Sequence, residues 1–298
     1  MDITLRNVVK IFGSIKVLDG VSLSVPSGRK TALIGPNGSG KSTLTRILMG
    51  MLACEGEVLL DGLSPFARRE RLARRMAYVP QSPPQLSASV ADVVRAVARI
   101  RDLEERRIAV IAAQFDLDLG ALAGRPIRAL SAGMKQKLLI ALALSSRADL
   151  LILDEPTASL DVSARARFFS LFAEMSGTAT LLLCSHRLEE IQHLVEHVVA
   201  LDGGRVIFDG PVETFLQTRA VSLMEVVTTR NSHADWLRAH GFRPAFGSSW
   251  VRSVARAEKM ALLNEIVAQF DGDLDNVVIR DVETLSDKAW EARSCADG

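Results

Sequence analysis

A glycine-rich segment of this sequence carries the residue types that bind phosphate groups. Residues 35–43 read Gly-Pro-Asn-Gly-Ser-Gly-Lys-Ser-Thr, which is the phosphate-loop spacing of Gly, four residues, Gly, Lys and then Ser or Thr. Glycines allow backbone N–H groups to turn toward phosphate oxygens, and a helix that starts here adds partial positive charge. We expect Lys41 to reach the β- and γ-phosphates of a nucleotide and Ser42 to ligate Mg²⁺. The predicted phosphate-binding residues are Gly35, Pro36, Asn37, Gly38, Ser39, Gly40, Lys41, Ser42 and Thr43.

Two adjacent carboxylates follow a run of apolar residues. Residues 150–153 are all Leu or Ile, the length of a buried strand, and Asp154 and Glu155 come directly after them. On its own, a strand ending in two solvated acids is the simpler interpretation. Beside a phosphate loop, however, the carboxyl end of such a strand lies where α/β sheets bind ligands. We therefore expect Asp154 to ligate Mg²⁺ and Glu155 to act as a general base toward water.

Strands and helices are predicted to alternate around these motifs. A short apolar strand at 31–34 precedes the phosphate loop, and a helix at 42–51 follows it. The pattern then predicts helices at 132–146, 163–175 and 187–195, and strands at 150–154, 180–185 and 197–201. Such alternation indicates a mainly parallel sheet covered on both faces, and hence an α/β fold. Further strands are predicted at 3–9, 21–25, 58–60 and 206–208.

A helical stretch interrupts this alternation. Between about residues 89 and 116, apolar residues recur every three to four positions, which is the spacing of an amphipathic helix. Ser89 and Asp92 have the spacing of a capping box at its start. We interpret residues from about 86 to 146 as a helical subdomain inserted into an α/β domain that spans residues 1–215.

Four further segments accompany the phosphate loop and the acidic strand. They are Tyr78-Val79-Pro80-Gln81, Leu130-Ser131-Ala132-Gly133-Met134, Pro156-Thr157-Ala158-Ser159-Leu160-Asp161 and Ser185-His186. In this order, the six motifs resemble those of the ABC ATPase family over residues 1–214. The resemblance implies a P-loop NTPase fold that binds ATP and Mg²⁺ and hydrolyses ATP to drive transport.

The resemblance also implies a role for each matching residue. Ser131 and Gly133 would contact the γ-phosphate held by a partner subunit, and Asp161 would lie at the dimer interface. His186 would sense the γ-phosphate, and Gln81 would contact Mg²⁺ or the attacking water. Because the chain has one phosphate loop and one signature, two copies, or one copy and a homologous ATPase, would complete a site. The implied partners are this second ATPase and one or more membrane-spanning permease subunits.

Phe12 lies where the family usually stacks an aromatic ring on adenine. The resemblance therefore implies that Phe12, which precedes Gly13, binds the nucleotide base. The alternative is that the Phe12 ring belongs to the hydrophobic core.

The signature departs from the usual family pattern. The common form is LSGGQ, whereas residues 130–134 read LSAGM and are followed by Lys-Gln-Lys. Ser131 and Gly133 are kept, so we expect an active ATPase. Met134 in this context resembles export-type members of the family. The run from Val282 to Trp290 also resembles the tail of export-type members, and the length and layout are comparable to those of the nitrous-oxide reductase copper-maturation type.

Residues 216–298 form a predicted accessory domain. The pattern predicts a strand at 221–228, a helix at 232–240, two strands within 243–255, a helix at 257–270 and a strand at 277–279. The order βαββαβ is typical of a small ferredoxin-like module. We expect Met260, Leu263, Val267 and Phe270 to form the buried stripe of its second helix. A role in dimerisation or regulation is expected for this domain.

Composition bounds the choice of partners and compartment. The net charge is +1, so the chain has no excess of positive charge of the kind that nucleic-acid-binding proteins carry. The basic run Arg68–Arg75 is interpreted as a solvated helix. No apolar run approaches the roughly 20 residues of a membrane span. The three cysteines, an odd number without metal-binding spacing, indicate a reduced compartment. We expect the cytoplasmic face of the inner membrane, reached through the permease.

The favoured function is ATP hydrolysis that drives outward transport. One alternative is the ATPase of a solute importer, which would usually carry LSGGQ. A second is a soluble ABC protein that acts on ribosomes or DNA, although such proteins usually carry two ATPase halves. A third, a nucleotide sensor without hydrolysis, is disfavoured because Glu155 and His186 are both present.

Overall fold

The computed structural model describes residues 1–175, 177–219, 221–229, 233–245, 248–255, 258–270 and 272–281. The chain divides into two compact units. The first contains Met1–His186 and Glu190–Asp209, and the second contains Arg187–Glu189 and the described residues from Gly210 onward. The predicted tail motif from Val282 to Trp290 lies outside the described residues.

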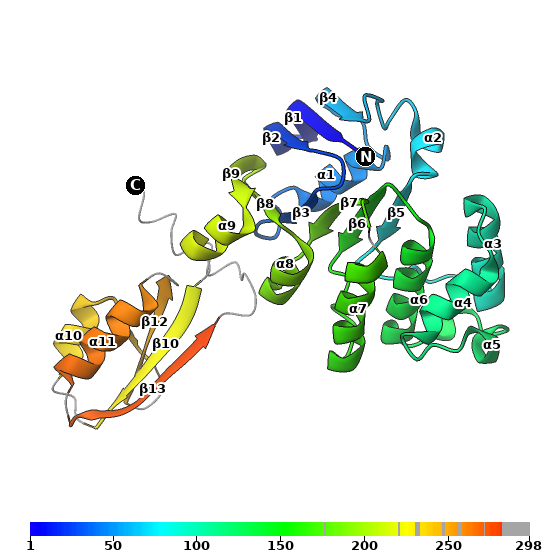
Figure 1. Cartoon of the computed structure of the whole chain (residues 1–298). Helices are drawn as coiled ribbons and strands as arrows, with labels where there is room; N and C mark the ends of the chain where they lie inside the picture. The colour runs from blue at the N-terminus through cyan, green and yellow to red at the C-terminus, as the bar shows by residue number, and fades with distance from the viewer. Residues whose placement is uncertain are drawn as a thin grey trace. The chain divides into compact units, whose positions relative to one another are not determined.

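A six-stranded sheet forms the centre of the first unit (Figure 1). Its strands run in the order β5-β6-β7-β3-β8-β9. Their bounds are β3 Lys30–Ile34, β5 Met76–Val79, β6 Leu150–Asp154, β7 Thr180–Cys184, β8 His197–Asp202 and β9 Arg205–Pro211. The pairs β5–β6, β6–β7, β7–β3 and β3–β8 are parallel, which confirms the predicted α/β fold.

A three-stranded antiparallel sheet, in the order β2-β1-β4, belongs to the same unit. It comprises β1 (Ile3–Phe12), β2 (Ile15–Val25) and β4 (Glu55–Leu60). The first two strands are longer than the sequence predicted, because they continue as a hairpin that turns at Gly13 with φ 60°. The side chains of Ile11, Phe12 and Ile15 are exposed there, so no burial pattern marked this part of the chain as strand.

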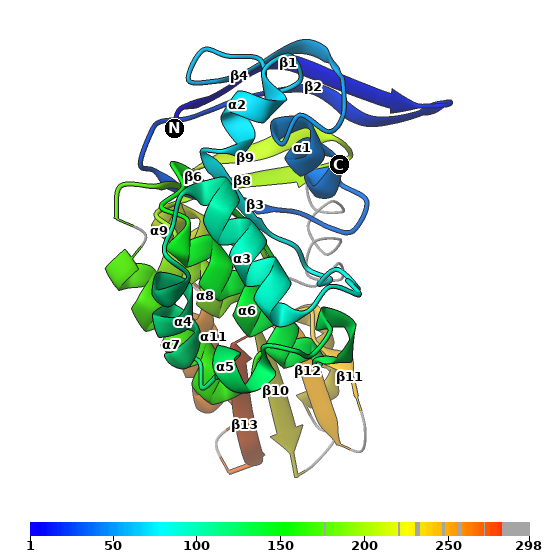
Figure 2. The ribbon, with the colours of Figure 1, turned by 90° about the vertical axis from the view of Figure 1, so that its right-hand side faces the viewer.

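Helices cover the six-stranded sheet and extend beyond one edge of it. Helix α1 (Lys41–Leu48) follows the phosphate loop, and α2 (Arg69–Ala73) precedes β5. The inserted helical layer, gathered beside β5 and β6 in Figures 1 and 2, contains α3 (Val90–Arg101), α4 (Glu105–Ala113), α5 (Leu119–Leu122) and α6 (Ala132–Ser145). Ser89 Oγ accepts a hydrogen bond from Asp92 N at 3.1 Å and caps α3, as the capping-box spacing predicts. Helix α7 (Val162–Met175) connects β6 to β7, and α8 (Leu188–Leu194) lies between β7 and β8 in the chain.

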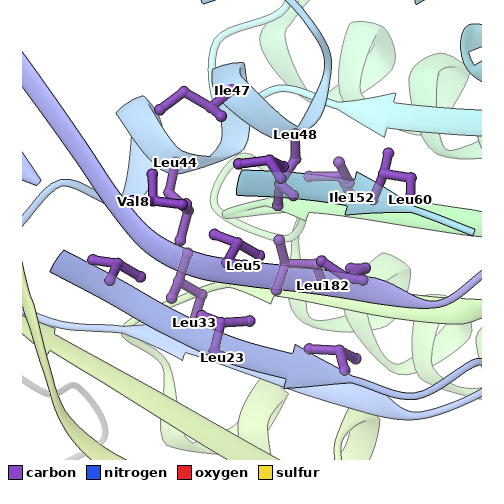
Figure 3. Close-up of a cluster of buried hydrophobic side chains, with 14 of the residues drawn as sticks. Leu5, Val8, Leu23, Leu33, Leu44, Ile47, Leu48, Leu60, Ile152 and Leu182 are labelled. Carbon is purple, nitrogen blue, oxygen red and sulfur yellow. The ribbon is translucent and has the colours of Figure 1, made fainter. Parts of the chain in front are cut away.

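The main core lies where both sheets meet α1. Figure 3 shows its leucine, isoleucine and valine side chains converging from β1, β2, β3, β4, β6, β7 and α1. Leu33, Leu44 and Ile152 are each at most 1% exposed. Truncating such a buried leucine to alanine costs about 2–5 kcal/mol. The core therefore holds α1 and the ends of β3, β6 and β7 in fixed positions.

The second unit carries a four-stranded antiparallel sheet in the order β11-β12-β10-β13. Its elements are α9 (Val212–Arg219), β10 (Val221–Thr228), α10 (Ala234–Ala239), β11 (Arg243–Pro244), β12 (Ser249–Ala255), α11 (Lys259–Gln269) and β13 (Leu274–Asp281). After α9, the order βαββαβ with this strand arrangement confirms the predicted ferredoxin-like module.

The predicted buried stripe of α11 is wrong in two positions. Met260 is 60% exposed and Val267 54% exposed, whereas Leu262, Ile266 and Phe270 are buried. The buried residues follow a spacing of four, i, i+4 and i+8, which places them on one face of the helix. Apolar residues surround this helix on several sides, so the period alone did not identify the face that packs on the sheet.

Within the part of the chain that the structure describes, none of the helices combines the length and hydropathy needed to cross a membrane.

Candidate functional site

Four adjacent parallel strands end at the same edge of the central sheet. β5 leads to Gln81, β6 ends at Asp154, β7 leads to His186 and β3 leads to Gly35. The register places Cys184, the last residue of β7, opposite both Leu33 of β3 and Asp154 of β6. Carboxyl ends of parallel strands form the ligand-binding edge of α/β sheets. The fold therefore brings four separate predicted motifs to one edge.

The phosphate loop requires glycine where other chain segments approach it closely. Gly35 has φ 149°, and a Cβ atom there would lie 2.1 Å from the Leu201 carbonyl oxygen. Gly40 has φ 104°, and a Cβ atom there would lie 2.6 Å from Leu18 Cδ2. Both positions combine left-handed backbone with contact distances that no side chain tolerates. The phosphate loop is therefore packed closely between β8 and the β1–β2 hairpin.

The residues of this loop present donors suited to phosphate. The N-cap residue of α1 is Gly40, which has no side chain to cap the helix, and no acidic residue lies in the first turn. The Lys41 ammonium donates hydrogen bonds to the carbonyl oxygens of Gly35 at 2.6 Å and Pro36 at 2.9 Å. Ser39 Oγ is buried and has no hydrogen-bond partner within the described ranges. A helix amino end, an ammonium and a buried hydroxyl together fit an anion such as a nucleotide phosphate.

Asp154 provides a carboxylate at the end of β6. Burial and the neighbouring Glu155 raise the pKa of Asp154 above its ordinary value. The Tyr78 hydroxyl donates to Asp154 Oδ2 at 3.4 Å, and burial together with Asp154 raises the pKa of Tyr78 to about 12. With the exposed hydroxyl of Ser42 at the start of α1, Asp154 offers the oxygen ligands that Mg²⁺ prefers.

Glu155 and His186 form a hydrogen-bonded pair beside Asp154. Glu155 Oε1 lies 2.6 Å from His186 Nδ1 and accepts a second hydrogen bond from the His186 backbone N–H at 3.0 Å. Glu155 Oε2 is buried and has no partner in the described part of the chain. Its backbone is left-handed, with φ 47°, and its N–H donates to the Cys184 carbonyl oxygen at 2.8 Å. A non-glycine residue held in left-handed backbone is typical of a functional position.

Gln81 and Phe12 both lie on exposed segments of the first unit. Gln81 is exposed and follows β5 by two residues. Phe12 is 44% exposed at the tip of the β1–β2 hairpin, so it does not belong to the core. Lys10 Nζ lies 5.1 Å from the centroid of the Phe12 ring, a cation–π contact that helps to orient this exposed side chain.

The signature motif forms a second cluster around the start of α6. Ser131 caps this helix, accepting a hydrogen bond from Met134 N at 3.2 Å. A Cβ atom at Gly133 would lie 3.0 Å from the Ser159 carbonyl oxygen, so residues 131–134 lie against the segment that leads to Asp161. Asp161 Oδ1 accepts a hydrogen bond from Ala164 N at 2.8 Å, so Asp161 caps the start of α7. Signature and Asp161 are therefore brought together on one surface.

Sequence reasoning missed several residues that support these two clusters. Tyr78 was recognised only as part of a motif, although a tyrosine one residue before the end of a short apolar strand could have signalled a polar contact at the sheet edge. Thr157 Oγ1 donates to the buried carboxylate of Glu190 on α8, a tertiary contact that no sequence spacing reveals.

Comparisons with known proteins agree with this geometry. A family model described as "ABC transporter" matches residues 18–158. The chain is 37% identical over 213 residues to "Nod factor export ATP-binding protein I" of Cupriavidus metallidurans, which covers 69% of this chain and 70% of that protein. It is 33% identical over 235 residues to "Nickel import ATP-binding protein NikO" of Rhodobacter capsulatus, covering 73% and 92%. A solved structure described as "Structure of ATP binding subunit of ABC transporter" has a TM-score of 0.66 and 26% identity, covering 72% of this chain and 92% of that one.

Proposed function

Because this chain belongs to the ABC transporter family and is one of its ATP-hydrolysing subunits, we propose that ATP bound on residues 35–43 drives outward transport through a separate membrane permease. The chain thereby acts at the cytoplasmic face of the membrane, and its C-terminal module, residues 216–298, serves dimerisation or regulation. The pair formed by Glu155 and His186 carries the hydrolytic part of this proposal, since a binding module without hydrolysis has no need for a carboxylate that is held in this way at the same edge of the sheet as the phosphate loop.

Nucleotide binding uses the loop, the hairpin tip and the two metal ligands. Lys41 exchanges its bonds to the Gly35 and Pro36 carbonyls for phosphate oxygens, which a flexible ammonium does readily. Phe12 offers its accessible face to adenine. Asp154 and Ser42 would hold Mg²⁺ together with Gln81, which follows β5, the neighbour of β6 in the sheet. When bound, Mg²⁺ neutralises charge on the phosphates.

Hydrolysis needs a base close to the γ-phosphate. Glu155 accepts a proton from the attacking water through Oε2, the oxygen that has no other partner among the described residues. His186 holds Oε1 from two directions and so fixes the orientation of the carboxylate. His186 is also half exposed, which allows its ring to contact the γ-phosphate directly.

Two chains complete each site in this proposal. Ser131, Gly133 and Asp161 form a cluster of their own on the first unit, and each chain holds one phosphate loop and one such cluster. A head-to-tail pair, made from two copies or from one copy and a homologous ATPase, would place the signature of each chain on the nucleotide of the other. Closure and reopening of that pair couple ATP turnover to the permease.

The direction of transport rests on the signature and on one relative. LSAGM followed by Lys-Gln-Lys resembles the form found in export-type members, and the relative at 37% identity carries an export name. The relative at 33% identity carries an import name, so an importer is the specific alternative.

The direction can be tested without knowing the substrate. Source cells that carry Lys41→Ala would be compared with cells that express the wild-type chain at the same level, and mass spectrometry would profile the medium and the cell contents. Export predicts a compound that disappears from the medium of the Lys41→Ala cells and accumulates inside them. A medium compound that only the wild-type cells deplete would contradict export and support import.

A further inference from the structure

A buried lysine on α6 is held by two neutral oxygens. Lys135 is 7% exposed, and its ammonium donates to Gln85 Oε1 at 2.9 Å and to the Arg128 carbonyl oxygen at 3.1 Å. Within the ranges that the structure describes, Lys135 forms no ion pair with a carboxylate. Burying an ammonium without an opposite charge is costly, so its position calls for an account beyond packing.

The two ends of this bond lie in segments with different tasks. Lys135 follows the helix cap Ser131 by one turn of α6, so it moves with the signature. Gln85 follows Gln81 by four residues, on the exposed segment between β5 and α3. A single hydrogen bond therefore joins the helix that carries the signature to the segment that carries Gln81.

The next residue of α6 makes a parallel connection. Gln136 is 1% exposed, and its Nε2 donates to the Pro156 carbonyl oxygen at 3.0 Å. Pro156 directly follows Glu155, so this bond reaches the catalytic end of β6. Consecutive side chains of one helix thus bond to both segments that surround the chain's own nucleotide site.

We propose that Lys135 is a positioning residue that couples the chain's own nucleotide site to the signature it presents to its partner. This inference rests on the proposed function, in which Gln81 responds to the bound nucleotide and Ser131 faces the partner's nucleotide. When the Gln81 segment shifts, the Lys135–Gln85 bond transmits the shift to α6, while Gln136 holds the same helix to the turn after Glu155. The consequence is cooperative hydrolysis by the two sites.

Gln85 offers a way to alter this link without disturbing the core. It is exposed, so its substitution leaves folding intact, whereas substitution of buried Lys135 risks unfolding. Gln85→Glu replaces the neutral acceptor with a charged one and keeps the bond to the ammonium. Gln85→Ala removes the acceptor, and Gln85→Lys places a like charge beside Lys135. Gln114→Ala, at the exposed end of α4 in the same helical layer, is the matched control.

The test is the ATP-concentration dependence of hydrolysis by the full chain and these four variants. Two coupled sites give a Hill coefficient of up to about 2, and loss of coupling gives about 1. We expect Gln85→Glu and Gln114→Ala to match the wild type. Gln85→Ala and Gln85→Lys should lower the Hill coefficient to about 1 and the maximal rate by at least about fivefold, with the larger loss for lysine. Binding of a fluorescent ATP analogue to the separate chain should be the same in all variants.

Two results would overturn the proposal, and they are distinguishable. If wild-type hydrolysis is cooperative and Gln85→Lys matches it in rate and Hill coefficient, the coupling role of Lys135 is wrong while the proposed function stands. The same holds if Gln85→Glu loses activity as Gln85→Lys does. If the wild type hydrolyses ATP without cooperativity and does not dimerise with ATP, the two-chain site itself is wrong, and this inference falls with it.

Discussion

His186 holds one oxygen of Glu155 from two directions, with its ring Nδ1 at 2.6 Å and its backbone N–H at 3.0 Å. The other oxygen, Oε2, is buried and has no hydrogen-bond partner in the described part of the chain. The two residues follow adjacent strands, β6 and β7, so the pairing comes directly from the parallel order of the sheet. This arrangement fixes one carboxylate oxygen and leaves the other able to accept a proton.

Replacing His186 should separate binding from turnover. His186→Ala removes the ring contact that orients Glu155, so we expect ATP hydrolysis to fall about 100-fold, the lower end of general-base contributions. Binding of a fluorescent ATP analogue should persist, because the phosphate loop is unchanged. His193→Ala, on the exposed side of α8, serves as the control and should keep the wild-type rate. A His186→Ala variant that hydrolyses ATP normally would contradict the orienting role.

The signature can be tested by two substitutions on α6. Ser131→Arg places a long side chain at the surface that is proposed to face the partner's nucleotide, and we expect hydrolysis to fall by about 100-fold or more. Met134→Gln restores the common family residue on a half-buried position and should leave the rate nearly intact. ATPase assays at equal protein concentration measure both. Equal inactivation by the two substitutions would contradict the interpretation of LSAGM as a functional signature.

The ion pairs of Arg75 should stabilise the first unit in a pH-dependent way. Arg75 Nη2 lies 2.6 Å from Asp61 Oδ2, and Arg75 Nε lies 2.5 Å from Asp149 Oδ2. Burial alone would raise the pKa of Asp61, but hydrogen bonds from Asp2 N–H and Arg75 outweigh it and lower that pKa below its ordinary value. The stabilisation is therefore complete above the ordinary aspartate pKa of about 4 and disappears as the pH falls through the lower folded value.

Asp61→Asn should consequently destabilise the protein at pH 7 but not in acid. Because these side chains are 31–45% exposed, we expect a loss of only about 1 kcal/mol at pH 7. Thermal unfolding at pH 7 and pH 3, at low and high salt, measures this loss. Asp102→Asn, an exposed aspartate that also has a positive φ, is the control. A destabilisation of equal size at both pH values would argue against the ion pair as its cause.

The C-terminal module should be dispensable for nucleotide binding. Residues 1–215 contain every predicted site residue and all strands of the central sheet, while the second unit has its own core of residues such as Trp250, Leu262 and Phe270. We predict that residues 1–215 alone fold and bind a fluorescent ATP analogue, and that the full chain dimerises or docks its permease better. Lys41→Ala in the same fragment controls for unspecific binding. An insoluble fragment, or one that fails to bind ATP, would contradict this domain boundary.

Much of the central sheet could be predicted because its residues combine strong local signals. The apolar run that ends at Asp154 has the length and composition of a buried strand, and the phosphate loop must lie between a strand and a helix. Parallel order then places Asp154, Glu155 and His186 at one edge. The family resemblance supplied Gln81 and Ser131, which no local pattern would have identified.

Other features depend on tertiary contacts and could not be predicted. The β1–β2 hairpin continues through exposed Ile11 and Phe12, where pairing between strands replaces burial as the stabilising interaction. The buried face of α11 is decided by the sheet on which it packs, because apolar residues lie all around the helix. The contacts of Tyr78 with Asp154 and of Lys135 with Gln85 join residues 76 and 50 positions apart.

The most direct measurement of the central claim is ATP turnover and dimerisation of Glu155→Gln. Glutamine keeps an oxygen for the two hydrogen bonds from His186 but cannot accept a proton from water. We predict that this variant binds ATP and Mg²⁺, elutes as a dimer in size-exclusion chromatography with ATP, and hydrolyses ATP roughly 100- to 10,000-fold more slowly. Glu174→Gln, the same change at an exposed position near the end of α7, should behave as the wild type. Hydrolysis by Glu155→Gln at the wild-type rate would contradict the assignment of Glu155 as the base and the mechanism built on it.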